Sequence, residues 1–277
     1  QELRAMLDKL EAETGREYEL TSAIGAGYDK IEDVDYSQAQ QYMDYIFLMS
    51  YDYYGAWSNV TGHQAALYCS SHFRVGQCDG TGVDEEGVPY KGPAYTTDNA
   101  VQNLLAQNVP SKKIVVGAAM YGRGWEGVYP ENATIADNPM TAPGNGKLKG
   151  TTAQGVWEDG VIDYKGIKTY MLGAAENGIN GFETGYDEQA EAAYVWNRSN
   201  GKLITYDNRR SVLAKGAYVN QYNLGGLFAW EIDADNGDIL NAMHEALGGT
   251  VTEPSNRAPV LSVSSAVSVN SGESVSV

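Results

Sequence analysis

The chain has 277 residues, of which 43% are hydrophobic, so it can bury a substantial core as one large domain or two ordinary ones. Its 36 Asp and Glu residues outnumber its 19 Lys and Arg residues, and the formal net charge is -17 at pH 7. This charge disfavours nucleic acid and anionic membrane surfaces as partners, and no apolar run approaches the roughly 18 to 20 residues that span a bilayer.

The beginning of the chain alternates predicted helices and strands. Apolar residues recur at helical spacing over residues 2–13, which predicts an amphipathic helix. Residues 18–24 and 45–48 read as strands, and residues 37–43 between them fit a short helix. Strands and helices in this order predict an α/β fold with a parallel sheet.

Residues 58–93 form a long predicted loop. Loops of this length are usually functional or mobile, so we expect this one to overhang the functional site of the protein. The loop holds the only two cysteines of the chain, Cys69 and Cys78. A disulfide that closes a small loop in an oxidising compartment is the favoured interpretation. His63 and His72 leave a zinc site open as the alternative, although their spacing matches no standard pattern.

The second half of the chain interrupts the alternation of strands and helices. A Val-rich strand is predicted at residues 114–121. Residues 122–206 then carry Gly-, Asn- and Pro-rich turns and short alternating strands, which predicts an insertion. Helical periodicity returns at residues 208–220, a strand follows from residue 225, and residues 237–247 form a last amphipathic helix.

Three predicted strands end in an aromatic residue beside polar groups. The motifs are residues 49–55 (Met-Ser-Tyr-Asp-Tyr-Tyr-Gly), 120–125 (Met-Tyr-Gly-Arg-Gly-Trp) and 230–235 (Trp-Glu-Ile-Asp-Ala-Asp). One such stretch alone would favour ordinary core packing of the aromatic residues. Their recurrence favours a shared site, because the carboxyl ends of barrel strands meet on one face, where the active site lies.

These three motifs resemble the last three strand-end motifs of glycoside hydrolase family 18 chitinases of the bacterial type, which have an inserted α+β domain. The resemblance covers residues 1–247. One departure stands out, because the catalytic Asp-x-x-Asp-x-Asp-x-Glu run of the family occurs nowhere in the chain. By this resemblance the run belongs just upstream of Gln1, so we expect a truncated start and an inactive fragment.

The resemblance implies the C-terminal half, strands five to eight, of a (β/α)8 TIM barrel. After residue 248, a linker composition followed by alternating residues predicts the start of an all-β module. This segment resembles the start of the immunoglobulin-like accessory domains of secreted bacterial polysaccharidases. The expected divisions are barrel strands five to seven at 1–121, the α+β insertion domain at 122–206, barrel completion at 207–248, a linker at 249–257 and the truncated β-sandwich at 258–277.

In this family the 2-acetamido group of the substrate itself attacks the anomeric carbon. The resemblance implies that Tyr51 donates a hydrogen bond to the acetamido carbonyl and that Asp52 lines the cleavage subsite. For Tyr51 and Asp52 the alternative role is a hydrogen-bond network at the rim. For Trp230 the alternative is a buried core residue, and for Arg123 it is a surface salt bridge. The implied substrate-binding residues are Met49, Trp57, Tyr121, Arg123, Trp157, Glu158 and Trp230.

The implied activity is hydrolysis of β-1,4-N-acetylglucosaminidic bonds in chitin with retention of configuration. A non-catalytic chitin-binding lectin on the same fold is the alternative, but the Tyr51-Asp52 pair favours the enzyme. No cofactor or metal is expected, since Gly-x-Gly-x-x-Gly, Walker and Cys-x-x-Cys motifs are absent. The expected partners are chitin or chitooligosaccharides, with no nucleic acid and no membrane, for a monomeric, secreted, extracellular bacterial protein.

Overall fold

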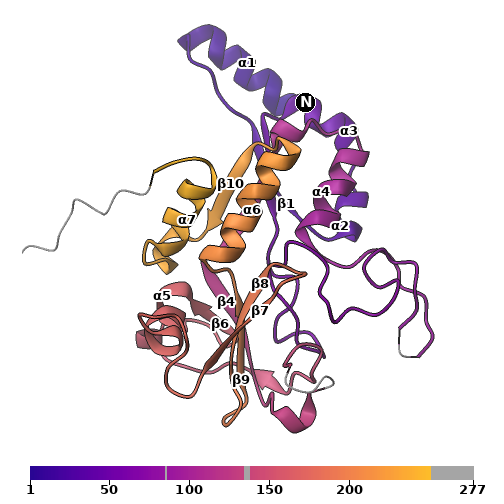
Figure 1. The fold of residues 1–277 in the computed structure, drawn as a ribbon. Helices are drawn as coiled ribbons and strands as arrows, with labels where there is room; N and C mark the ends of the chain where they lie inside the picture. The colour runs from indigo at the N-terminus through magenta and orange to yellow at the C-terminus, as the bar shows by residue number, and fades with distance from the viewer. Residues whose placement is uncertain (85, 134–137, 251–277) are drawn as a thin grey trace, which may run out of the picture.

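The computed structural model describes residues 1–84, 86–133 and 138–250 (Figure 1). Its α-helices are α1 (Glu2–Thr14), α2 (Tyr28–Glu32), α3 (Tyr36–Ala39), α4 (Thr97–Ala106), α5 (Tyr164–Ile167), α6 (Arg209–Tyr222) and α7 (Asp238–Ala246). Its strands are β1 (Thr21–Gly25), β2 (Tyr45–Met49), β3 (Ile114–Ala119), β4 (Tyr121–Glu126), β5 (Gly146–Lys147), β6 (Val161–Asp163), β7 (Glu183–Asp187), β8 (Ala192–Asn197), β9 (Lys202–Tyr206) and β10 (Gly226–Trp230).

Several single helical turns connect these elements. The 3-10 turns are η1 (Gln40–Tyr42), η2 (Ser111–Lys113), η3 (Pro130–Asn132), η4 (Thr152–Gln154) and η6 (Ile232–Ala234), and η5 (Lys168–Leu172) is a π-helical turn. The expected short helix at 37–43 is therefore α3 followed by η1. Helix α2 was not predicted, because a helix of five residues is too short to show a helical period.

The first sheet is parallel, and its strand order among the described residues is β1-β2-β3-β10. Strand β3 is buried along its whole length, as its Val-rich sequence predicts for a sheet with covered faces. Helices α4 and α6 cover one face, where Leu104 and Val219 pack with Leu48 and Val116 in one hydrophobic cluster. On the other face, the rings of Phe47 and Phe228 lie edge to face.

The second sheet is antiparallel and is formed entirely by the chain between β3 and α6. Its order among the described residues is β5-β4-β9-β8-β7, with β6 paired to β4 as well. In the view of Figure 1 it lies below the parallel strands. Trp125 and Trp196 are fully buried within it. The short alternating strands expected at 122–206 are therefore present, and β8 includes the predicted residues 194–196.

The expected strand at 114–121 is divided between the two sheets, so the predicted end of this strand at Tyr121 is wrong. Strand β3 ends at Ala119, and Tyr121 begins β4 opposite Asp163 in the second sheet. Met120 makes the transition, because its N–H donates to the Trp230 carbonyl while its own carbonyl accepts from Tyr164. These hydrogen bonds between distant segments leave no trace in the apolar run of the sequence.

The segment between β2 and α4 contains no helix or strand in the described residues 50–84 and 86–96. Cys69 and Cys78 form a disulfide with 1.95 Å between their Sγ atoms, so neither thiol is free to bind zinc. The Ser70 hydroxyl donates to the Asp187 carboxylate over 2.7 Å, which attaches this loop to the end of β7. The loop is therefore fastened to the second sheet.

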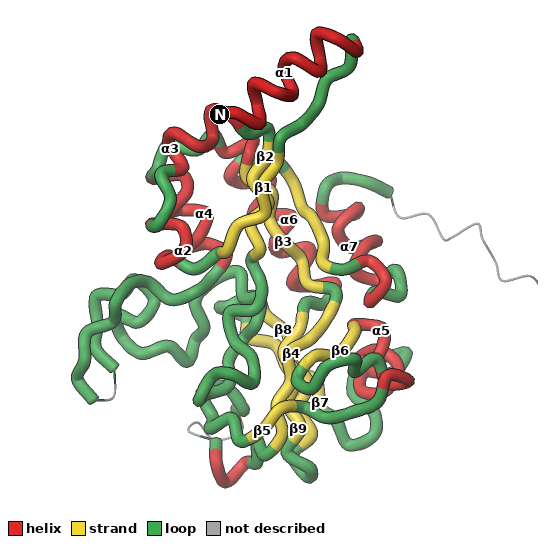
Figure 2. Tube along the Cα trace, turned by 180° about the vertical axis from the view of Figure 1, so that it is seen from behind, coloured by secondary structure: helices red, strands yellow, loops and turns green. Residues whose placement is uncertain are grey.

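The two ends of the described chain lie away from the sheets or at the limit of the described residues. Helix α1 projects away from the sheets (Figure 2), and its apolar residues Leu3 and Met6 are 63% and 68% exposed. No helix in the described ranges has both the length and the apolar character that a membrane span requires. The predicted accessory domain at 258–277 and all of the linker after residue 250 lie outside the described residues.

Candidate active site

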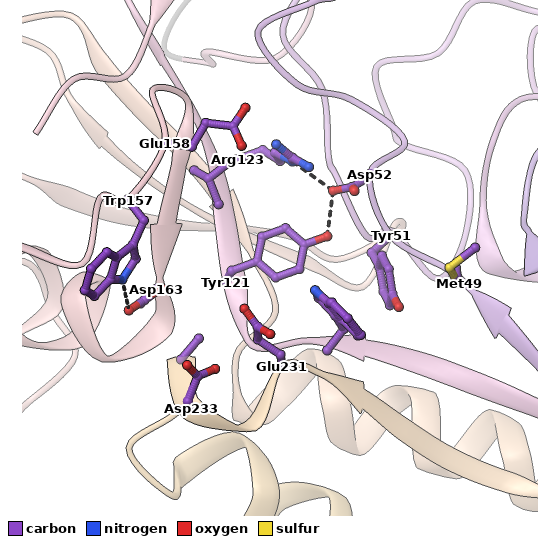
Figure 3. Close-up of a pocket in the computed structure, with 13 residues that line it drawn as sticks. Met49, Tyr51, Asp52, Tyr121, Arg123, Trp157, Glu158, Asp163, Glu231 and Asp233 are labelled. Atoms are coloured by element: carbon purple, nitrogen blue, oxygen red, sulfur yellow. Dashed lines mark hydrogen bonds and ion pairs between the residues drawn. The ribbon is translucent and has the colours of Figure 1, made fainter. Parts of the chain in front are cut away.

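A cavity of about 700 Å³ opens where the carboxyl ends of β2 and β10 meet the second sheet (Figure 3). All the predicted catalytic and substrate-binding residues except Trp57 line it, together with residues to which the sequence analysis gave no role. The lining residues are Met49, Tyr51, Asp52, Tyr121, Arg123, Trp157, Glu158, Val161, Asp163, Trp230, Glu231, Asp233 and Ala234. The shared face expected from the three strand-end motifs is therefore present.

Tyr51 enters the cavity at the end of β2. The buried hydroxyl of Ser50 bonds both the N–H and the carbonyl of Gly117 on β3, which fixes the strand end. A Cβ on Gly117 would lie 2.8 Å from the Tyr51 ring, so glycine makes room for that ring. Burial, with the nearby negative charge of Asp52, raises the pKa of Tyr51 to about 12, so its hydroxyl stays a hydrogen-bond donor at neutral pH.

Asp52 follows in the left-handed backbone region, with φ at 60°, and its carboxylate turns toward the second sheet. Its Oδ1 accepts a hydrogen bond of 2.6 Å from the Tyr121 hydroxyl and another of 2.8 Å from Arg123 Nε. The pKa of Tyr121 is raised far above its usual value, first by burial and then by the Asp52 charge. We call Asp52, Tyr121 and Arg123 the carboxylate cluster.

Trp57 lies outside the lining of the cavity, which differs from its expected place among the sugar-contacting residues. Its ring lies over Gly55, where an added Cβ would be 2.2 Å away, and the Arg123 guanidinium lies 4.8 Å from the ring centre. Trp57 thus stacks behind Arg123. The salt bridge considered for Arg123 is present, since Arg123 pairs with Asp52 at the cavity with side chains 17% and 38% exposed.

Two tryptophans give the cavity its apolar surface. Trp230 at the end of β10 is 56% exposed, so it is not the buried core residue that the sequence left open. Trp157 is 72% exposed, and its indole N–H donates to Asp163 over 3.1 Å (Figure 3). Such exposed indole faces suit stacking on a sugar ring. Because little packing surrounds Trp157, the Asp163 carboxylate holds its orientation.

The sequence analysis did not assign roles to several residues that build the site. Glu231 and Asp233 follow Trp230 within the quoted motif, so the strand-end signal could have included them. Asp163 and Gln64 offer no such signal, because only the folded chain brings them to Trp157 and Asp52. The loop after β2 does not overhang the cavity as expected, since none of residues 58–84 and 86–93 lines the cavity. Gln64 of this loop instead contacts the backbones of Asp52 and Tyr121, which do line it.

Comparison with known proteins shows the family to which the chain belongs. The family model for glycosyl hydrolases family 18 matches residues 1–235. Chitinase A of Pseudoalteromonas piscicida is 67% identical over 277 residues, which are 100% of this chain and 34% of that protein. A chitinase of Autographa californica nuclear polyhedrosis virus is 50% identical, over 88% of this chain and 38% of that protein. The chain belongs to glycosyl hydrolases family 18.

The solved structures agree with this assignment. A family 18 N-acetylglucosaminidase from Paenibacillus barengoltzii superposes with a TM-score of 0.69 at 27% sequence identity. That match covers 88% of this chain and 61% of the other. The chain spans about a third of the length of the curated relatives named above, at 34% and 38%. The predicted resemblance to family 18 is confirmed.

Proposed function

We propose that the protein containing this chain hydrolyses β-1,4-N-acetylglucosaminidic bonds in chitin by a retaining, substrate-assisted mechanism. The observation that carries the proposal is the carboxylate cluster beside Tyr51 in a cavity faced by Trp157 and Trp230. Relatives named as chitinases, at 67% and 50% identity, support this substrate class. Chitin and chitooligosaccharides are the proposed partners.

Each part of the cavity has a task in this reaction. The acetamido oxygen of the cleaved sugar must attack its own anomeric carbon, and positive charge spreads over the oxazolinium ring that forms. The Tyr51 hydroxyl, a protonated donor with a pKa of about 12, would hold the acetamido group in line. The Asp52 carboxylate would stabilise the developing positive charge. Trp230 would stack under the sugar, and Trp157 under a neighbouring one.

The proposal requires a general acid that protonates the leaving oxygen. The catalytic run of the family does not occur in these 277 residues, and the proposal places that acid outside this chain. We further propose that β1, β2, β3 and β10 are strands five to eight of a (β/α)8 barrel and that β4–β9 form the inserted α+β domain. The parallel order β1-β2-β3-β10 and the match to 61% of the P. barengoltzii chain support this proposal.

The remaining expectations stay predictions. They are the monomeric state, secretion to the outside of a bacterial cell, the immunoglobulin-like module and the roles of the single site residues. The disulfide between Cys69 and Cys78 agrees with an oxidising compartment.

Proton NMR during hydrolysis of a soluble N-acetylchitooligosaccharide by the complete protein tests the mechanism. Retention predicts that the first-formed product is the β-anomer, which then mutarotates. An initial α-anomer would refute the retaining mechanism. Cellulose oligomers that are cleaved faster than chitin oligomers would refute the substrate class.

The 1–277 fragment tests the position of the general acid. Purified by itself, the fragment should show no turnover of the same oligosaccharide, because the proposed acid is missing and two edge strands remain open. The complete protein is the positive control. Turnover by the fragment above the blank would mean that the general acid lies within these residues.

A further inference from the structure

Gln64 is a fully buried side chain directly behind the cavity, in the loop that follows β2. Its side-chain Oε1 accepts from the Asp52 N–H over 3.2 Å, and its Nε2 donates to the Tyr121 carbonyl over 2.8 Å. Its backbone carbonyl accepts from Tyr53, and its backbone N–H donates to the Thr205 hydroxyl on β9. All four polar groups of this residue are therefore engaged.

Together with the hydrogen bond between Tyr121 and Asp52, the two side-chain bonds of Gln64 close a ring. On the cavity side, the Tyr121 hydroxyl bonds the Asp52 carboxylate over 2.6 Å. On the buried side, the Gln64 amide joins the backbones of the same two residues. Asp52 lies in the loop just after β2 of the first sheet and Tyr121 begins β4 of the second, so the Gln64 amide links the two sheets at this point.

The conformation of Asp52 explains why such a bridge is needed. Its φ of 60° lies in the left-handed region, which residues other than glycine seldom adopt. The bond from its N–H to Gln64 favours this conformation and points the carboxylate at Tyr121 and Arg123. A glutamine suits the position because the Asp52 N–H needs an acceptor while the Tyr121 carbonyl needs a donor.

We propose that Gln64 is a positioning residue for the reaction, acting through Asp52. This inference rests on the proposed function, because it assigns Gln64 the orientation of the carboxylate that stabilises the reacting sugar. Gln64 is fully buried and does not line the cavity, so we expect it not to contact a bound sugar. Its loss should therefore lower kcat through a displaced Asp52 carboxylate, and it should change KM much less.

A double-mutant cycle in the complete protein tests the proposal, with steady-state kinetics on a soluble N-acetylchitooligosaccharide. Gln64→Leu should lower kcat by about 10- to 100-fold, the cost expected for a misplaced catalytic group, with KM changed by less than about threefold. In an Asp52→Asn background, the same change should lower kcat by less than about threefold, since the group that it positions has lost its charge. Equal losses in both backgrounds would overturn the proposal.

A matched control and a second variant separate positioning from stability. Gln107 bridges two backbone groups in the same way, accepting from the Tyr36 N–H over 3.0 Å and donating to the Ile31 carbonyl over 3.4 Å, away from the cavity. Gln107→Leu should lower the Tm while leaving kcat unchanged. Gln64→Glu keeps the acceptor for Asp52 but loses the donor to Tyr121, and it should lower kcat even if Gln64→Leu does not fold.

The cycle also separates this inference from the proposed function. If Asp52→Asn lowers kcat strongly while Gln64→Leu and Gln64→Glu do not, only the inference about Gln64 fails. If Asp52→Asn leaves turnover intact, the role of Asp52 in the proposed function fails and the inference fails with it.

Discussion

The hydroxyl of Tyr121 donates a 2.6 Å hydrogen bond to the carboxylate of Asp52, across the boundary between the parallel and the antiparallel sheet. Only 7% of the Tyr121 surface is exposed, so packing and not solvent directs its hydroxyl. Hydrogen bonds to charged groups are stronger than those between neutral groups. This single bond therefore joins two sheets and orients the carboxylate proposed to face the reacting sugar.

We predict that Tyr121→Phe lowers kcat/KM of the complete protein by roughly 10- to 100-fold. A hydrogen bond to a charged group contributes about 1.5–3 kcal/mol, and the loss of this one leaves Asp52 with Arg123 as its side-chain donor. Steady-state kinetics on a soluble chitin oligomer measures the effect. Tyr164→Phe is the control, because Tyr164 is also buried, with 1% exposed, and its hydroxyl donates to Asp238 outside the cavity. Similar losses in both variants would contradict a specific role for Tyr121.

We predict that Tyr51→Phe lowers kcat far more than it changes KM. The hydroxyl should matter most as the acetamido oxygen becomes part of a charged ring, so it stabilises the transition state more than the bound substrate. The loss of one such donor costs about 3–4 kcal/mol, or a hundredfold or more in kcat. The ring keeps its packing against Phe228 and Tyr121, so folding should be preserved. An increase in KM alone would argue against the catalytic role.

We predict the opposite kinetic pattern for Trp230→Ala. Stacking acts on the sugar both before and during the reaction, so its loss should appear mainly in KM, at roughly 1–3 kcal/mol. The neighbouring Ile232 is 63% exposed and is absent from the lining, so Ile232→Ala controls for the loss of exposed apolar surface at this turn. A fall in kcat with an unchanged KM for Trp230→Ala would refute the stacking role.

The location of the site could be predicted from the sequence because local composition carries it. Apolar strands that end in aromatic and charged residues mark the carboxyl edge of a parallel sheet, and the structure brings those strand ends together. The sequence also indicated the second sheet, since the alternation of predicted strands and helices stops after Tyr121, two residues beyond the end of β3 at Ala119. Helix α4 begins after Thr96, a residue type that favours a helix N-cap, and the Thr96 hydroxyl accepts from the Asn99 N–H.

The supporting contacts could not be predicted, because they join residues that are far apart in the chain. Gln64 bonds a carbonyl 57 positions away, and Asp187 accepts from Ser70 across 117 positions. The division of the strand at Met120 depends on its bond to Trp230. The family resemblance predicted that Trp57 contacts the sugar. In the structure its ring lies over Gly55 and against the Arg123 guanidinium instead. Local patterns identify the lining residues, whereas tertiary contacts determine their orientation.

The ammonium group of Lys215 and the carboxylate of Asp207 form a buried ion pair beneath the site, 2.6 Å apart. Their residues are 0% and 1% exposed. Asp207 also accepts hydrogen bonds from the Ala119 N–H and the Ser211 hydroxyl, so it attaches the end of β3 to the start of α6. A carboxylate in this position depends on its cation, because little water reaches it.

We predict that Lys215→Met destabilises the complete protein by about 3–5 kcal/mol, the usual cost of leaving a charge buried without its partner. Arg209→Met is the matched control, since Arg209 pairs with Glu245 on the surface with side chains 58% and 40% exposed, and such pairs contribute less than about 1 kcal/mol. Urea denaturation followed by tryptophan fluorescence gives both free energies of unfolding. The double variant Lys215→Met with Asp207→Leu removes both charges and should recover part of the loss. Equal destabilisation by the two single variants would mean that the buried pair does not stabilise the fold in this way.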